Sequence, residues 1–149
     1  YHLINVMGNY RLDGQKIWKT PTTLVLELFT KYHKGEILKT SVSSPTFSSP
    51  ALGKQPVYKN NKLIDASATY DQNQVCLSIV NKSEKESLIV SIPQHKKIIA
   101  NYLVNGSSPT GLNDKKNLHK ITIKKNQLEC GEDFVEIPPH SFSLILMKV

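Results

Sequence analysis

Residues 65–81, DASATYDQNQVCLSIVN, contain two runs in which apolar residues alternate with small or polar ones. The short turn Asp71-Gln72-Asn73 separates the two runs. Alternation of apolar with small or polar residues has the period of a half-buried strand, so this stretch predicts a β-hairpin. Working outward, strand-like runs recur about every ten residues in residues 88–92, 97–105, 118–124, 134–137 and 141–149. This spacing indicates a mainly β chain built as an antiparallel β-sandwich or jelly roll.

The N-terminal part has a different pattern. An apolar run at residues 2–7 predicts a buried strand, and the polar residues 8–19, with the turn signal Asp13-Gly14, predict a loop. A helix is predicted over residues 21–34, with Thr20 as its N-cap and Gly35 as its stop. One strand followed by one helix is the repeat unit of a (β/α)8 barrel, and a single unit cannot close one.

The sequence therefore predicts two unequal parts. Residues 1–35 are the strand-loop-helix segment left over from a (β/α)8 barrel, and residues 36–149 are the β-sandwich domain. The apolar face of the helix needs a partner, and the sandwich is the only candidate in this chain. Residues 43–61, rich in Ser, Pro and Lys, are predicted to form an excursion loop rather than a linker.

Composition limits the classes of function. The net charge is +7, but Arg11 is the only arginine, whereas nucleic-acid readers usually rely on Arg for bidentate contacts. We therefore expect a solvated basic surface and no nucleic-acid partner, with phosphate, nucleic acid or an acidic polysaccharide as the alternatives. The apolar start, residues 1–7, is too short to span a bilayer, so no membrane partner is expected.

The cysteines and histidines give no metal pattern. Cys76 and Cys130 lie in strand-like runs without a CxxC spacing, and the five histidines are spread singly. We expect no metal and no other cofactor. Two buried thiols in a reducing compartment are the favoured interpretation, with one disulfide as the alternative, which favours a cytoplasmic location over a secreted one.

Several motifs resemble one enzyme family. Residues 20–29, TPTTLVLELF, resemble the TPT-x-H-V-F-E-L-Y stretch that opens the eighth barrel helix of family 51 α-L-arabinofuranosidases, and residues 3–6, LINV, resemble its eighth-strand L-V-N-V. The sandwich part carries four further matches in register: LIDASATYD at 63–71, VCLSIVNK at 75–82, LVNG at 103–106 and PPHSF at 138–142. The resemblance covers the chain from end to end, in the family's order.

The resemblance implies a parent enzyme that releases terminal α-L-arabinofuranose by a retaining mechanism, with two glutamates about 5 Å apart. In that family both glutamates lie on barrel strands upstream of this segment. The chain is thus expected to contain no catalytic residue, to hydrolyse nothing alone and to serve as a C-terminal accessory domain. The alternative is a carbohydrate-binding β-sandwich module.

Two side chains are candidates for substrate binding. By register, the resemblance places His2 where the family has a glutamine that reaches the sugar, so the sequence departs from the family there. Trp18 is the only tryptophan and could stack on a sugar, or pack at the junction between loop and helix. The implied partners are the barrel of the same polypeptide and arabinose-containing oligosaccharides or polysaccharides; a homo-oligomer is left open.

Overall fold

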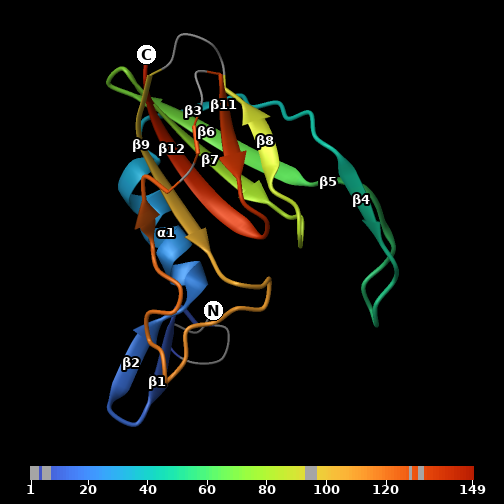
Figure 1. Cartoon of the computed structure of the whole chain (residues 1–149), viewed down its shortest axis with the longest axis vertical. Helices are drawn as coiled ribbons and strands as arrows, with labels where there is room; N and C mark the ends of the chain where they lie inside the picture. Colours follow the sequence, from blue (N-terminus) through green and yellow to red (C-terminus); the bar gives the residue numbers. More distant parts are fainter. Residues whose placement is uncertain (1–3, 5–7, 93–96, 128, 131–132) are drawn as a thin grey trace.

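The computed structural model of the chain describes residues 4, 8–92, 97–127, 129, 130 and 133–149. The fold is mainly β, with antiparallel sheets, a single helix among the described residues and no closed barrel, which confirms the predicted class (Figure 1). The described elements, in chain order, are β1 (Tyr10–Asp13), β2 (Lys16–Lys19), α1 (Pro21–Tyr32), β3 (Glu36–Leu38), β4 (Thr46–Ser49), β5 (Tyr58–Lys62), β6 (Ile64–Asp71), β7 (Gln74–Asn81), β8 (Leu88–Ser91), β9 (Lys97–Asn105), β10 (Lys124–Lys125), β11 (Phe134–Ile137) and β12 (Ser141–Lys148).

A six-stranded sheet is the centre of the molecule, in the order β10-β9-β12-β7-β6-β3. The predicted hairpin forms its middle, because β6 pairs with β7 in antiparallel register from Ile64 opposite Asn81 to Asp71 opposite Gln74. Gln72 and Asn73 both have positive φ, 47° and 64°, the conformation that a two-residue hairpin turn requires. The turn therefore sets the register that the alternating sequence predicted.

The sheet is covered on both faces. On one face a cluster that includes Val75, Ile79 and Ile145 packs with Val135 and Ile137 of β11, which pairs with β8 as the second, smaller sheet of the sandwich. The opposite face is covered by α1 (Figure 1). Strand β12 is buried over seven of its eight residues because its side chains alternate between the two covered faces, which explains its nearly continuous apolar sequence.

Helix α1 packs on the sheet of its own chain, as its apolar face predicted. Leu24 and Leu28 are 7% and 3% exposed, and both belong to a cluster with Phe142, Leu144 and other residues of β7, β9 and β12. The helix ends at Tyr32, two residues earlier than expected, and Gly35 has the predicted positive φ of 72°. A β-carbon at residue 35 would lie 2.2 Å from the carbonyl oxygen of Tyr70, so glycine is also required by space.

The start of α1 corrects one prediction. Thr20 makes no side-chain capping hydrogen bond; its hydroxyl instead donates to the carbonyl oxygen of Asn9 at 3.0 Å. The hydroxyl of Thr23 donates to the same carbonyl. The two threonines thus fasten the helix to the chain before β1, and the helix begins with Pro21, whose missing N–H leaves one donor fewer to satisfy.

Three segments differ from the predicted loops and strands. Residues 8–19 and 43–61 were expected to be loops, but they contain the hairpins β1–β2 and β4–β5. The strand expected over 118–124 is wrong apart from its end, because β10 begins only at Lys124. Residues up to Ile123 form a loop whose apolar Ile121 is buried beside α1. The strand expected over residues 2–7 lies outside the described residues, except for Ile4, which bridges to Tyr10.

The two cysteines are free thiols, but they are not both buried. Cys76 is buried in β7, whereas Cys130 is exposed, which corrects the expectation of a second buried thiol. Of the run around residue 130, the structure describes residues 129 and 130: Cys130 bridges to Val135, and the carbonyl oxygen of Glu129 accepts a hydrogen bond from the N–H of Glu136.

Candidate functional site

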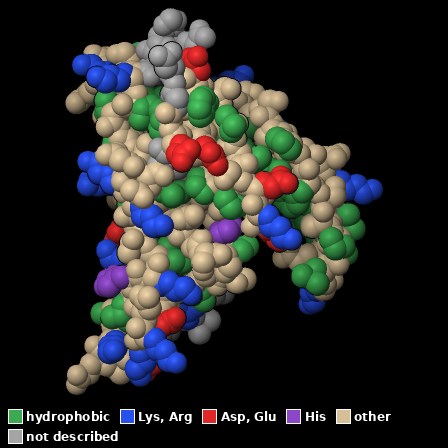
Figure 2. Space-filling model, viewed as in Figure 1, with side chains coloured by type: hydrophobic (Ala, Val, Ile, Leu, Met, Phe, Trp, Pro, Cys, Tyr) green, Lys and Arg blue, Asp and Glu red, His purple; other side chains and the backbone are tan. Residues whose placement is uncertain are grey.

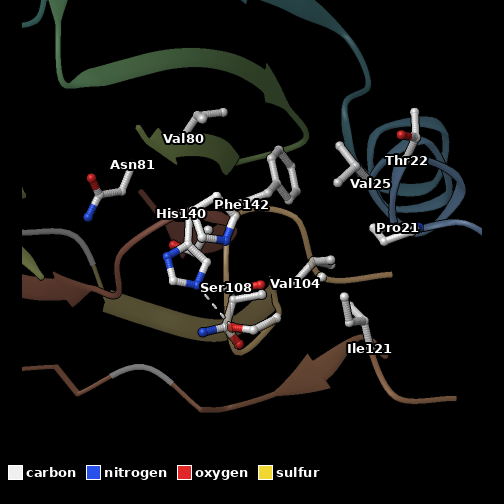
Figure 3. A pocket seen from close by; sticks show the side chains of 15 residues that line it. Pro21, Thr22, Val25, Val80, Asn81, Val104, Ser108, Ile121, His140 and Phe142 are labelled. Atoms are coloured by element: carbon white, nitrogen blue, oxygen red, sulfur yellow. Dashed lines mark hydrogen bonds between the residues drawn. The ribbon is translucent and has the colours of Figure 1, made fainter. Parts of the chain in front are cut away.

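A cavity lies at one end of the sheet, beside the first turn of α1. Its volume is about 450 Å³, and it is bounded by the ends of β7 and β9, the loop 106–111 and the turn that enters β12 (Figure 3). Its walls are mostly apolar, with Val25, Val80, Val104 and Phe142 facing the space. Concave, largely apolar sites with a few polar groups are the usual form of a binding site.

Four of the family-like motifs, far apart in the sequence, meet at this cavity. The helix start contributes Pro21 and Thr22, and the end of β7 contributes Val80 and Asn81. The segment 104–106 follows β9, and the turn 140–142 leads into β12. Sequence reasoning quoted these motifs without expecting them to converge. The sequence held one sign of this convergence: each motif lies at the end or start of a strand or at the start of the helix. Antiparallel pairing brings the end of one strand next to the start of its neighbour.

Asn81 explains the motif at the end of β7. Its side chain is 1% exposed, and its amide nitrogen donates to the carbonyl oxygens of Glu86, Ile137 and Pro138 at 2.9 Å, 3.0 Å and 3.0 Å. Its amide oxygen accepts a hydrogen bond from the backbone N–H of Ser83 at 2.9 Å. Asn81 thus satisfies backbone groups that would otherwise be buried without partners, which is a structural role.

His140 connects two loops at the same place. Its backbone has a positive φ of 39°, and its ring lies between the chain at Glu84 and the loop at Gly106; Figure 3 shows the ring at the edge of the cavity. Nδ1 lies 3.1 Å from the carbonyl oxygen of Glu84, and Nε2 lies 3.0 Å from that of Gly106. Both ring nitrogens therefore face backbone acceptors and neither is directed at a nucleophile.

The cavity does not have the chemistry of a glycosidase centre. Among the described residues that line it, none is an aspartate, a glutamate or a cysteine, whereas glycoside hydrolysis commonly requires a pair of carboxyl groups. The described part of the chain also holds no cluster of three His, Cys, Asp or Glu side chains that could ligate a metal. What the arrangement provides is a rigid junction of helix, sheet and loops with an apolar hollow.

Three of the groups with shifted pKa values lie beside α1. Burial lowers the pKa of His33, whose ring stacks on Phe29 at a centroid distance of 4.3 Å. Burial raises the pKa of Cys76 to about 12. Burial, together with a hydrogen bond to the Tyr32 hydroxyl at 2.5 Å, raises the pKa of Tyr102 to about 12. Each shift favours the neutral form, as expected for groups packed inside a core.

Of the two predicted sugar-binding residues, the structure describes only Trp18, which does not line this cavity. His2 lies outside the described residues. Trp18 lies in β2 and lines a second cavity of about 320 Å³ between the β1–β2 hairpin and residues 113–122. Its indole N–H donates to the carbonyl oxygen of Asn113 at 2.9 Å, and its ring is half-buried. Trp18 thus packs at a junction and also borders an open space; its role in sugar binding stays a prediction.

Asn113 holds this second junction together and was not foreseen from the sequence. It is 7% exposed; its amide nitrogen donates to the carbonyl oxygens of Lys19 and Ile121 at 3.1 Å and 3.0 Å. Its amide oxygen accepts from the N–H of Ile121 at 2.6 Å. A buried asparagine inside a long polar loop has no sequence signal of its own, because the carbonyl of residue 19 is distant along the chain.

Fold and site together define a mainly β domain of the sandwich type, with one helix docked on its central sheet. Residues 2–141 match the alpha-L-arabinofuranosidase C-terminal domain family. The chain therefore belongs to this family, which confirms the resemblance seen in its motifs. In the described residues no helix is long and apolar enough to cross a membrane.

Solved structures show the same fold. An α-L-arabinofuranosidase from Thermotoga maritima, in an arabinose complex, matches with a TM-score of 0.84 and 20% identity, over 99% of this chain and 33% of that one. A family 51 enzyme from Thermotoga petrophila matches with a TM-score of 0.79 and 21% identity, over 97% and 32%. One from Bifidobacterium longum matches with a TM-score of 0.81 and 17% identity, over 99% and 29%. The chain thus spans about a third of these enzymes. Among curated proteins none matches.

Proposed function

We propose that this chain serves as the structural accessory domain of a family 51 α-L-arabinofuranosidase, in which it braces the last helix of the catalytic barrel. In this proposal residues 1–35 derive from the barrel and residues 36–149 form the accessory sandwich. The parent acts on terminal α-L-arabinofuranosides, and the barrel of the same polypeptide supplies both catalytic glutamates.

The observation that carries the proposal is the packing of α1. Leu24 and Leu28 are buried against the sheet and join it to the helix in one apolar cluster. Fully burying two such side chains contributes on the order of 3–6 kcal/mol by area reasoning, an upper estimate. The surface of the helix that faces away from the sheet includes Leu26, which is 46% exposed. The same helix can therefore contact the sheet on one side and a further domain on the other.

The activity of the isolated chain tests this proposal. A tagged preparation, purified free of host glycosidases, is incubated with 4-nitrophenyl α-L-arabinofuranoside. The expected rate of hydrolysis equals that in buffer alone. The described residues that line the two cavities include no aspartate or glutamate, so neither cavity offers the pair of carboxyl groups that hydrolysis requires. Hydrolysis above buffer that co-elutes with the chain through two further chromatographic steps would contradict the structural role.

A second candidate function is the binding of neutral glycans, and the half-buried ring of Trp18 beside a cavity favours it. Affinity electrophoresis in gels that contain arabinan or arabinoxylan separates the two candidates. A structural domain migrates as it does in a gel without polysaccharide. Retardation by either polymer would instead support a carbohydrate-binding module.

A further inference from the structure

The second cavity combines aromatic walls with a basic rim. It lies between the β1–β2 hairpin and residues 113–122, with Tyr10, Trp18 and Leu118 among its lining residues. Lys19 and His119 line it as well. Figure 2 shows Lys and Arg side chains gathered at the lower end of the molecule, where Figure 1 places β1 and β2.

The two walls are fastened to each other. Besides the hydrogen bond from Trp18 to Asn113, the ammonium group of Lys115 lies 2.9 Å from the carboxylate of Asp13. Arg11 is the cross-strand partner of Trp18, so the two side chains share one face of the hairpin. Asp13 and Lys16 are the next pair on that face. The cavity is therefore a built junction rather than a gap between loose loops.

Charge is concentrated around this junction. Residues 10–20 and 113–122 contain six Lys and Arg and two Asp, a net charge of +4 out of the +7 of the chain. Lys115 pairs with Asp13, and Lys19 pairs with Glu27. Four other cations of these two segments make no ion pair with any residue that the structure describes: Arg11, Lys16, Lys116 and Lys120. Their charge is available to an anionic partner.

We propose that this cavity and the cations of the hairpin and of residues 113–122 bind a linear acidic polysaccharide, with one sugar ring against Trp18 and uronate carboxylates at these cations. Aromatic rings pack on the C–H faces of sugars, and Lys side chains act as mobile point charges that suit carboxylates spaced along a chain. This site goes beyond the proposed structural role and does not depend on it.

A single-stranded nucleic acid fits the cavity less well. Binding of successive bases uses a row of aromatic side chains along a groove, whereas Trp18 is paired across the hairpin with Arg11 and not with a second aromatic residue. Arginine, the residue that nucleic-acid sites favour, occurs once in these two segments, as Arg11. DNA is therefore the discriminating probe in the experiment rather than the expected ligand.

Trp18 makes the site directly observable, because it is the only tryptophan of the chain. The 149-residue chain is titrated with oligogalacturonate while its tryptophan fluorescence is followed at about 50 mM and about 200 mM salt. We expect a saturable change in emission and an affinity that falls by about tenfold or more between these salt concentrations. Neutral arabino-oligosaccharides should give no change. The absence of any change with oligogalacturonate at low salt would overturn the proposal.

Charge-reversal variants separate this site from net charge. Lys16→Glu combined with Lys116→Glu should weaken oligogalacturonate binding by about tenfold or more. The matched control is Lys54→Glu with Lys59→Glu, which makes the same change in net charge on the β4–β5 hairpin and should alter affinity by less than about twofold. Equal weakening by both pairs, or single-stranded DNA of equal charge binding as tightly with the same change in Trp18 emission, would overturn the proposal.

Discussion

The two faces of the six-stranded sheet are covered by different parts of the chain. One face is covered by β8 and β11, which belong to the sandwich that the sequence predicts. The other is covered by α1, which the sequence assigns to the end of another fold. Yet both faces are equally closed, since Leu144 and Ile145, neighbours on β12 that point to opposite faces, are both 0% exposed. The boundary predicted at residue 35 therefore does not separate two hydrophobic cores, because α1 and the sheet share one.

The largest expected effects come from these two neighbours. Ile145→Ala removes packing against β11, and Leu144→Ala removes packing against α1. Each should lower the free energy of unfolding by about 2–5 kcal/mol, because each leaves a cavity in a closed core. Urea denaturation of the two variants gives the comparison. If Leu144→Ala costs less than about 1 kcal/mol while Ile145→Ala costs the full amount, the helix face is not a packed core.

Two buried asparagines allow the same comparison with polar groups. Asn81→Ala leaves the carbonyls of Ile137 and Pro138 without their donor on the β11 side, and Asn113→Ala does the same to Lys19 and Ile121 beside α1. Each substitution should lower stability by about 1–3 kcal/mol, the cost of unsatisfied buried groups. Thermal melts of both variants, with the exposed Gln55→Ala as control, check this. If Asn81→Ala lowers stability and Asn113→Ala does not, the hydrogen bonds of Asn113 beside α1 do not contribute to the stability of the fold.

The smallest expected effect depends on pH and belongs to the α1 face alone. Burial holds the pKa of His33 below its ordinary value, so protonation favours the unfolded chain. The stabilising contribution is complete above about pH 6.5 and is lost as the pH falls below that value. His33→Phe should remove this part of the pH dependence while keeping the stacking on Phe29. The measurement is the free energy of unfolding of the unaltered chain and of His33→Phe, from denaturation curves between about pH 8 and pH 5. An equal loss of stability in both proteins as the pH falls would contradict this assignment.

The sequence predicted the β12–β7–β6 centre well because its strands are long and their patterns are consistent. Strand β7 was placed at its observed residues, the hairpin turn is one residue shorter than predicted because Asp71 belongs to β6, and β12 differs by one residue at its end. The predicted strand over 118–124 failed because Ile121 and Ile123 imitate the alternation of a strand, although both pack in a loop against the cluster beneath α1. Such packing against distant residues leaves no local period.

The hairpins β1–β2 and β4–β5 were missed for a related reason. Their residues are mostly polar and exposed, so there is no buried face to produce alternation. The candidate site was predictable only in part: Trp18 was singled out from the sequence, but Asn81, Asn113 and His140 act on backbone groups far along the chain. Side chains that satisfy remote carbonyls are recognised once the fold is known.

The most direct test is the accessibility of Cys76, which is 3% exposed and lies in the cluster beneath α1. In a Cys130→Ser chain, we expect a thiol reagent to react with Cys76 mainly after α1 leaves the sheet or the chain unfolds, because its side chain is 3% exposed although it borders a cavity of about 310 Å³. We expect labelling to be slower than in the denatured chain by about a thousandfold or more, and to accelerate when Leu28→Ala weakens the contact. Labelling at a rate near that of the denatured chain, unaffected by Leu28→Ala, would contradict the claim that helix and sandwich form one core.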